Sequence, residues 1–310
     1  MKILKLNLSR DEDPAGQGRN RANLNKKLKV RLSNAESHVI KLFNSIPRNS
    51  KTESNLSLNQ DTFTIYDYDL SLFEQNELET QIEAILNRWL VLGDNSNKPL
   101  DFYSDDNVEV AYRTGTLETV RDVNHDMEKA AILGGIVGAL ASLLPRRVDI
   151  NTILFSPAYI ESLSSYKADM FYQIKGLSEK VSSQLYERIS SGVKSNKTPR
   201  EIINDIKGRF GVANSSARRI VNTEINRIYN NSIMNTIDAV NVEGNIKAVG
   251  RHKSALLPTT RQSHALRHDK LYSTAQQRKW WDTDSNGTNR INCYCSFEIV
   301  LLDKNNKPIA

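Results

Sequence analysis

The stretch that decides the fold begins with SSARRIVNTEINRIYNNSIMNTIDAV, residues 215–240. Isoleucines recur along it at mostly helical spacing while arginines and asparagines occupy other faces, which is typical of a long amphipathic helix. PTTRQSHALRHDKLYS (258–273) and NRINCYCSFEIVL (289–301) follow, with two adjacent tryptophans between them. Three histidines and both cysteines therefore fall between residues 252 and 295. This clustering is the main indication of a functional site.

Helix signals dominate the chain before this stretch. Ser156–Pro157 predicts a capped helix start, and the segment Thr198–Glu201 combines a capping box with proline at the first helical position. We expect Gly176, Gly208 and Gly211 to end helices. Consecutive helices with short turns predict a helical bundle.

Short β-prone segments predict the rest of the fold. Residues 62–70 alternate apolar and polar side chains, as a strand does. Residues 245–253 and 293–301 predict strands of one small sheet packed on the long helix. The expected class is α+β and predominantly α-helical, with a small C-terminal α+β domain. The expected domains are a basic, weakly ordered arm (1–60), a helical partner-binding region (61–210) and the C-terminal domain (211–310).

The net charge of +6 is unevenly distributed. Residues 1–60 carry +7, residues 61–128 carry −12 and residues 129–310 carry +11. Basic ends around an acidic block suggest nucleic-acid contact at the ends and a separate partner surface in the middle. The alternatives are a solvated surface and, for the first block, a simple terminal extension. Within that block, residues 28–46 predict a helix that docks on the rest of the chain.

Cysteine use and hydropathy limit the class of protein. Two cysteines spaced Cys-x-Cys do not readily form a disulfide with each other, which favours a reducing compartment or metal binding. The first residues show no secretory signal. The one continuous apolar run, residues 130–144, is too short for an ordinary membrane span. We expect it to form a buried helix and the chain to lack a stable membrane anchor; the alternative is insertion into a membrane or pore on deployment.

Residue spacing suggests a metal site. His264 and His268 share a face if they lie on a helix, and Cys293 and Cys295 share a face if they lie on a strand. Together they supply the four ligands of a tetrahedral zinc site. Alternatively, the cysteines pack as small apolar residues and the histidines hydrogen-bond locally.

A catalytic interpretation uses some of the same residues as acid, base and phosphate clamp of a nuclease or phosphodiesterase. The candidate groups are Arg261, His264 and His268 beside Thr223, Glu224 and Arg227. Phosphate loops, paired acidic metal motifs and nucleophile elbows are missing from the sequence, so we expect no enzymatic activity. Trp280 and Trp281 follow basic residues and resemble a base-stacking patch. We favour the alternative, one ring in the core and one on a partner surface.

At these residues the chain resembles the phage Mu F-like minor head protein family, also called phage head morphogenesis proteins. ARRIVNTEINRIYNNS (217–232) is similar to that family's Arg-rich helix, TTRQSHALRHDKLYS (259–273) to its Arg-x-x-His motif, and NCYCSFEIV (292–300) to its terminal Cys-x-Cys motif. Order and spacing match as well. The residues singled out for motif or structural roles are Thr223, Glu224, Arg227, Asn230, Arg261, His264, Trp280 and Trp281, and the Cys-x-Cys motif adds Cys293 and Cys295.

The chain also departs from the family pattern. Pro258 and Thr259 stand where an acidic residue usually precedes the Arg-x-x-His. Arg290-Ile291-Asn292 replaces the His-Pro before the first cysteine, and Tyr294 replaces the arginine of Cys-Arg-Cys. These changes favour a structural role over a catalytic one.

The resemblance implies a virion component of a tailed phage, attached to the portal inside the capsid and assisting head assembly, DNA packaging or DNA ejection. Implied partners are the portal protein, through residues 61–210, scaffold or major capsid protein, and genomic DNA through basic segments. The alternative is a nuclease-like effector packaged in the head and delivered with the genome. The short segment after the Cys-x-Cys strand favours the structural protein.

Overall fold

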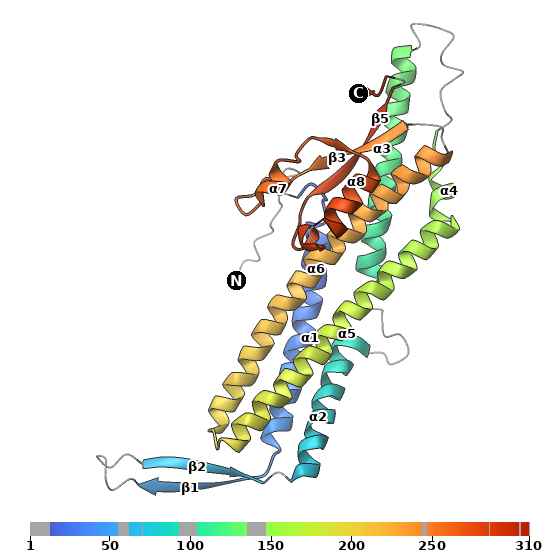
Figure 1. The fold of residues 1–310 in the computed structure, drawn as a ribbon. Helices are drawn as coiled ribbons and strands as arrows, with labels where there is room; N and C mark the ends of the chain where they lie inside the picture. Colours follow the sequence, from blue (N-terminus) through green and yellow to red (C-terminus); the bar gives the residue numbers. More distant parts are fainter. Residues whose placement is uncertain are drawn as a thin grey trace. The chain divides into compact units, whose positions relative to one another are not determined.

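The computed structural model describes residues 13–54, 62–69, 71–92, 104–134, 147–243, 247–284, 286–303 and 305–309, and most of them are helical (Figure 1). The helices are α1 (Gly18–Asn44), α2 (Leu72–Leu86), α3 (Val110–Gly134), α4 (Ile150–Leu154), α5 (Pro157–Lys194), α6 (Pro199–Glu243), α7 (Gln262–Ala265) and α8 (Thr274–Arg278). Shorter π or 3-10 turns are η1 (Asn87–Leu92), η2 (Ser104–Glu109), η4 (Lys279–Thr283) and η5 (Thr288–Arg290). The strands are β1 (Arg48–Ser54), β2 (Thr62–Tyr68), β3 (Lys247–Lys253), β4 (Leu271–Tyr272) and β5 (Ser296–Leu302). The predicted class, mainly helical α+β, is confirmed.

The chain forms two compact units. The sheet unit comprises Met1–Leu24, Tyr103–Ala168 and Val221–Ala310, and the bundle unit comprises Asn25–Phe102 and Asp169–Ile220. Helices α1, α5 and α6 contribute residues to both. This division does not follow the boundaries expected at residues 60 and 210, because each unit is assembled from segments that are distant in sequence.

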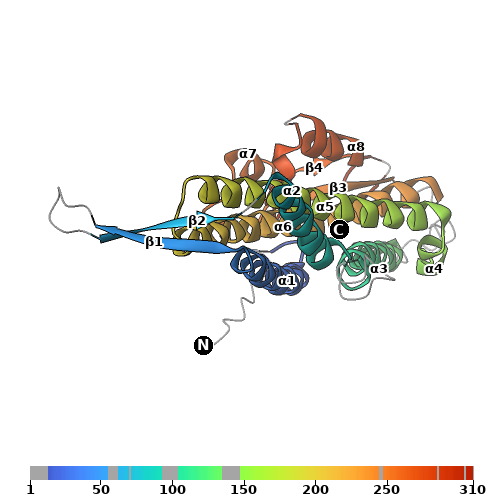
Figure 2. The same ribbon diagram turned by 90° about the horizontal axis from the view of Figure 1, so that it is seen from below.

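The bundle unit consists of parts of α1, α2, α5 and α6 around an apolar core. Its buried residues are Leu28, Leu32, Ala35, Val39 and Phe43 on α1, Leu78, Ile82 and Leu86 on α2, Ile174, Leu177, Val181, Leu185 and Ile189 on α5, and Ile202, Ile206, Phe210, Ala213 and Ala217 on α6. This spacing buries one stripe of each helix. The antiparallel β1–β2 hairpin belongs to this unit and extends away from its helices (Figure 2).

The first 60 residues correct an expectation. Residues 13–54 are not a weakly ordered arm, because α1 occupies residues 18–44 and β1 pairs with β2 along its whole length. The physical reason is the buried stripe of α1, which the high density of Lys, Arg and Asn around it obscured. The strand predicted at residues 62–70 is confirmed as β2.

The expected helix ends at three glycines are also wrong. Helix α5 continues through Gly176, and α6 continues through Gly208 and Gly211. A glycine inside a helix costs about 1 kcal/mol relative to alanine, and the buried residues on both sides of each glycine outweigh that cost. The predicted starts are confirmed: Ser156 Oγ accepts a hydrogen bond from Tyr159 N, and Thr198 and Glu201 form the capping box.

The sheet unit packs a three-stranded antiparallel sheet, ordered β4-β3-β5, with the C-terminal half of α6 and with α3. The predicted strand pair is confirmed, with His252 opposite Phe297. Two glycines allow close approach: a Cβ at Gly250 would overlap the Phe297 ring, and one at Gly115 of α3 would overlap Ser232 Oγ of α6. The first approach holds β3 against β5, and the second holds α3 against α6.

Most of the apolar run at residues 130–144 lies outside the described residues, since α3 ends at Gly134 and the description resumes at residue 147. Its predicted burial therefore stays a prediction. Among the helices described, none combines the length and the apolar character that crossing a membrane requires.

Candidate metal centre

The His- and Cys-bearing segments meet at one buried point of the sheet unit. His252 comes from β3, His264 from α7, and the cysteines from the loop that leads into β5. The cysteines precede the strand, which begins at Ser296, and are not on it as expected. All four side chains are buried: 0% exposed for His252, 2% for His264, 6% for Cys293 and 2% for Cys295.

Potential ligand atoms lie close together in this cluster. His264 Nδ1 is 3.4 Å from Cys295 Sγ and 3.5 Å from Cys293 Sγ. One ligand atom each of His252, His264 and Cys295 lies within 4.8 Å of the others. These three residues form a group that can hold a metal ion, and Cys293 adjoins it through His264.

The pKa values of the two cysteine thiols are shifted in opposite directions. The hydrogen bond from the Cys293 thiol, and the neighbouring imidazoles of His252 and His264, lower the pKa of the Cys295 thiol. The hydrogen bond to Cys295 and burial raise the pKa of Cys293. A Cys295 thiolate beside two imidazoles would attract a cation, because burial of a charge without a partner is costly.

Side chains behind His252 orient its ring. Gln277 Nε2 lies 3.0 Å from His252 Nδ1, and Gln277 Oε1 accepts a hydrogen bond from Arg267 Nη2 at 3.0 Å. Gln277 itself is fully buried. Nδ1 is thus occupied, whereas His252 Nε2 is buried and has no hydrogen-bond partner among the described residues.

His268, a predicted ligand, lies outside the cluster. Helix α7 ends at Ala265, so His264 and His268 do not share a helical face. His268 Nδ1 accepts a hydrogen bond from Ser254 N at 3.1 Å, and its Nε2 lies 3.2 Å from Asp269 Oδ2. The second histidine of the cluster is His252 and not His268. His252 is distant from the cysteines in sequence but lies beside Cys295 in the fold.

Helix α6 holds the Cys-x-Cys loop through a row of polar side chains. Thr223 Oγ1 accepts a hydrogen bond from Asn292 N at 3.1 Å. Asn226 Nδ2 donates to Cys293 O, and Asn230 Nδ2 donates to Cys295 O at 3.0 Å. Asn226 and Asn230 lie one helical turn apart and reach alternate residues of the extended loop. Predicted motif residues Thr223 and Asn230 therefore position the cysteines.

Arg261 holds the same loop from the opposite end. Its guanidinium donates to the carbonyl oxygens of Thr288, Asn289 and Ile291 at 2.8, 2.9 and 2.9 Å. These carbonyls belong to η5 and the residue after it, just before Cys293. Arg261 therefore acts as a backbone clamp in this structure.

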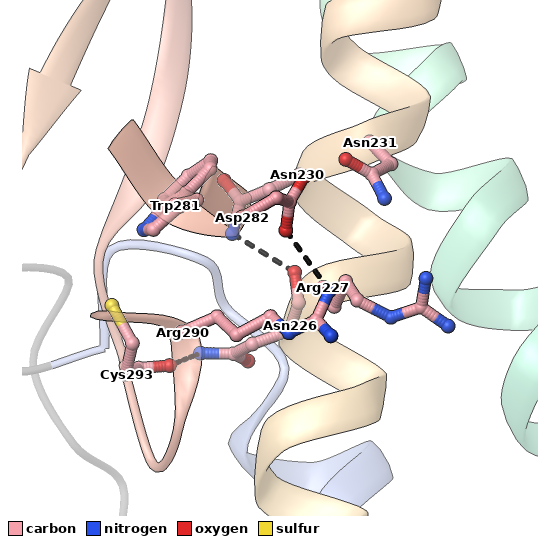
Figure 3. Close-up of a pocket in the computed structure, with 8 residues that line it drawn as sticks. All are labelled: Asn226, Arg227, Asn230, Asn231, Trp281, Asp282, Arg290 and Cys293. Carbon is pink, nitrogen blue, oxygen red and sulfur yellow. Dashed lines mark hydrogen bonds and ion pairs between the residues drawn. The ribbon is translucent and has the colours of Figure 1, made fainter. Parts of the chain in front are cut away.

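A small pocket with a cavity volume of about 20 Å³ adjoins the cluster on the α6 side (Figure 3). It is lined by Asn226, Arg227, Asn230, Asn231, Trp281, Asp282, Arg290 and Cys293. Both arginines have acidic partners: Arg227 Nε is 2.6 Å from Glu224 Oε2, and Arg290 Nη1 is 2.9 Å from Asp282 Oδ1. The predicted residues Glu224 and Arg227 thus neutralise each other at its edge.

Trp280 and Trp281 differ in burial, as expected, but both rings pack against the histidines. Trp281 is buried, with its ring centroid 5.9 Å from that of His252. Trp280 is half-buried, with its centroid 4.8 Å from that of His264, and Arg267 stacks on it at 4.2 Å. Trp280 therefore covers the histidines, and its expected role on a partner surface stays a prediction.

Three residues that form or support the cluster were not predicted from the sequence. His252 belongs to the noted cluster, but its separation from His264 follows no ligand spacing. Gln277 and Asn226 carry no motif of their own. The one available signal for Asn226 is its position four residues before Asn230, on the same face of α6.

Comparisons with protein-family models, curated proteins and solved structures found no match to the chain.

Proposed function

We propose that this chain is a minor head protein of a tailed phage, with a structural role in the virion. In this proposal it binds the portal inside the capsid, near the portal vertex, and assists head assembly, DNA packaging or DNA ejection. It resides in the host cytoplasm during assembly. The resemblance of residues 215–300 to Mu F-like proteins is the origin of the proposal.

The observation that carries it is the convergence of the three motif segments on one buried cluster. Thr223 and Asn230 hold the Cys-x-Cys loop, Arg261 clamps the residues before it, and His264 contacts both cysteines. Each motif residue contacts another residue within the segment 215–300. That arrangement favours a structural module over the nuclease-like alternative.

Zinc is the ion we propose for the group His252, His264 and Cys295. Imidazole and thiolate are the ligands that structural zinc sites use. The ion has no redox chemistry and would link β3, α7 and the β5 loop. Its role in this proposal is stability of the module.

Genomic DNA is a proposed second partner, through basic segments. Lys26, Lys29 and Lys41 are exposed on α1. Lysine contacts with DNA phosphates displace counterions, so such binding weakens as salt rises. Binding that is independent of salt, or no binding, would remove this part of the proposal.

Co-expression with the portal protein of the same genome tests the function. Size-exclusion chromatography with light scattering should show a stable complex, and mass spectrometry of purified virions should find the chain. A basic phage protein of similar size serves as the control for charge-driven association. Absence from virions together with DNA cleavage that His264→Ala abolishes would contradict the proposal and support the delivered enzyme.

A further inference from the structure

We propose that His252, His264, Cys293 and Cys295 together form a closed four-ligand site for one zinc ion. This inference rests on the structural zinc proposed above and is independent of the portal assignment. It differs from the spacing-based set in one ligand, His252 in place of His268, and it adds Cys293 to the three-residue group.

The first support is distance. In tetrahedral zinc sites the metal lies about 2.0–2.1 Å from nitrogen and about 2.3 Å from sulfur, so neighbouring N and S ligands lie about 3.5 Å apart. The His264 Nδ1 distances to the two sulfurs are 3.4 and 3.5 Å. One nitrogen at this distance from two sulfurs fits three corners of a tetrahedron.

The second support is the fourth corner. His252 Nε2 is buried and lacks a hydrogen-bond partner among the described residues, while Nδ1 is held by Gln277. A buried imidazole nitrogen without a partner is costly unless it meets a proton donor, an acceptor or a metal. His252 belongs to the group whose ligand atoms lie within 4.8 Å of one another. An ion at the centre of the group would meet this nitrogen, His264 Nδ1 and both sulfurs at once.

The third support is the rigidity of the frame around the four side chains. The carbonyls of Cys293 and Cys295 are held by Asn226 and Asn230. Arg261 fixes the preceding turn through three carbonyls. Second-shell partners of this kind orient metal ligands and raise affinity. Thr223, Asn226 and Asn230 are therefore positioning residues for the cysteines.

The site is closed, which decides its chemistry. Four protein ligands leave no position for water or substrate, and all four are buried. Trp280 and Trp281 cover the histidines. The zinc would therefore contribute to folding of the sheet unit and not to hydrolysis.

The test measures zinc in the full-length chain, purified under reducing conditions and dialysed against a weak chelator. Wild type should retain about one zinc per chain. His252→Ala should retain at least about tenfold less, because removal of one ligand opens the site. His268→Ala, the matched control, should retain the wild-type amount.

Cobalt substitution of the wild-type protein keeps the test independent of variant folding. Tetrahedral Co²⁺ with two thiolates should give intense ligand-field bands and a thiolate charge-transfer band. Loss of zinc in His268→Ala with retention in His252→Ala would overturn the ligand set. A wild-type chain without zinc, or with a Cys293–Cys295 disulfide, would overturn the site while leaving portal binding open.

Discussion

The orientation of the buried Gln277 amide depends on whether His252 binds a metal. As placed, its Nε2 faces His252 Nδ1 and its Oε1 faces Arg267. A metal on Nε2 puts the histidine proton on Nδ1, which then needs an acceptor. A half-turn of the amide brings Oε1 to that proton, because the two ends of the amide are nearly equal in shape. The same half-turn gives up the hydrogen bond from Arg267 Nη2 to Oε1.

Substitution of Gln277 tests this relation. Gln277→Glu gives His252 Nδ1–H a carboxylate acceptor and keeps an acceptor for Arg267, so zinc affinity should stay or rise. Gln277→Leu removes the acceptor and should lower zinc affinity by about 10-fold to 100-fold. Competition with a chromophoric chelator measures both. Equal affinities in the two variants would contradict the role of this amide.

Asn230 provides a second prediction at the residue scale. Asn230→Ala leaves the buried Cys295 carbonyl without its donor and should lower the free energy of unfolding by about 1–3 kcal/mol. Ser215→Ala, on the exposed surface of the same helix, is the control and should change it by less than about 0.5 kcal/mol. Urea denaturation measures both. A similar small effect at both positions would show that Asn230 does not hold the loop.

At the scale of elements, the effect of a glycine in a helix depends on which atoms pack against it. Gly176, Gly208 and Gly211 face open space inside continuous helices, whereas Gly115 lies where α3 meets α6. The sequence alone offers the same letter in each case. Capping residues are more informative: those at Ser156 and Thr198 predicted helix starts correctly, because a cap acts on its own backbone.

Alanine at two glycines separates these roles. Gly115→Ala places a Cβ against Ser232 and Tyr229 and should destabilise the protein by about 1–3 kcal/mol through overpacking. Gly176→Ala, in an exposed helix interior, should stabilise it by about 0.5–1 kcal/mol. Thermal unfolding should show shifts of opposite sign. A stabilising Gly115→Ala would contradict the close approach of α3 and α6.

The start of α6 supplies a pH prediction. Hydrogen bonds from the Thr198 side chain and backbone lower the pKa of Glu201 below its ordinary value of 4.5. Stabilisation from a lowered pKa is complete above pH 4.5 and is lost as the pH falls through the folded-state pKa. Thr198→Ala should therefore lower the melting temperature at pH 7, because it removes the hydroxyl that bonds both Glu201 N and the Glu201 carboxylate. The difference in melting temperature between wild type and Thr198→Ala should become smaller towards pH 3. A difference that does not change with pH would contradict stabilisation by the ionised Glu201 carboxylate.

For the whole molecule, local patterns predicted the elements better than their assembly. The fold class, the pairing of β3 with β5 and the presence of both cysteines in the buried cluster followed from periodicity and spacing. The division into units and the choice of His252 did not, because both depend on contacts between segments far apart in sequence. The N-terminal segment is the clearest case: Arg21 pairs with Asp13 at 2.9 Å, donates to Asn226 Oδ1 and stacks on Tyr294 at 4.6 Å.

Arg21 thus joins the N-terminal segment to the Cys-x-Cys loop within the sheet unit. Arg21→Met leaves Asp13 buried without its cation and should cost about 3–5 kcal/mol of unfolding free energy. Arg19→Met, at an exposed position of α1, should cost less than about 0.5 kcal/mol. Chemical denaturation distinguishes them. Equal effects would contradict docking of this segment.

X-ray absorption at the zinc edge of the purified wild-type chain is the most direct measurement, because it reads the ligands without any substitution. We expect two sulfur neighbours at about 2.3 Å and two imidazole nitrogens at about 2.0–2.1 Å. A shell with oxygen or water in place of a sulfur, or zinc bound without sulfur, would contradict the four-ligand site formed by His252, His264, Cys293 and Cys295.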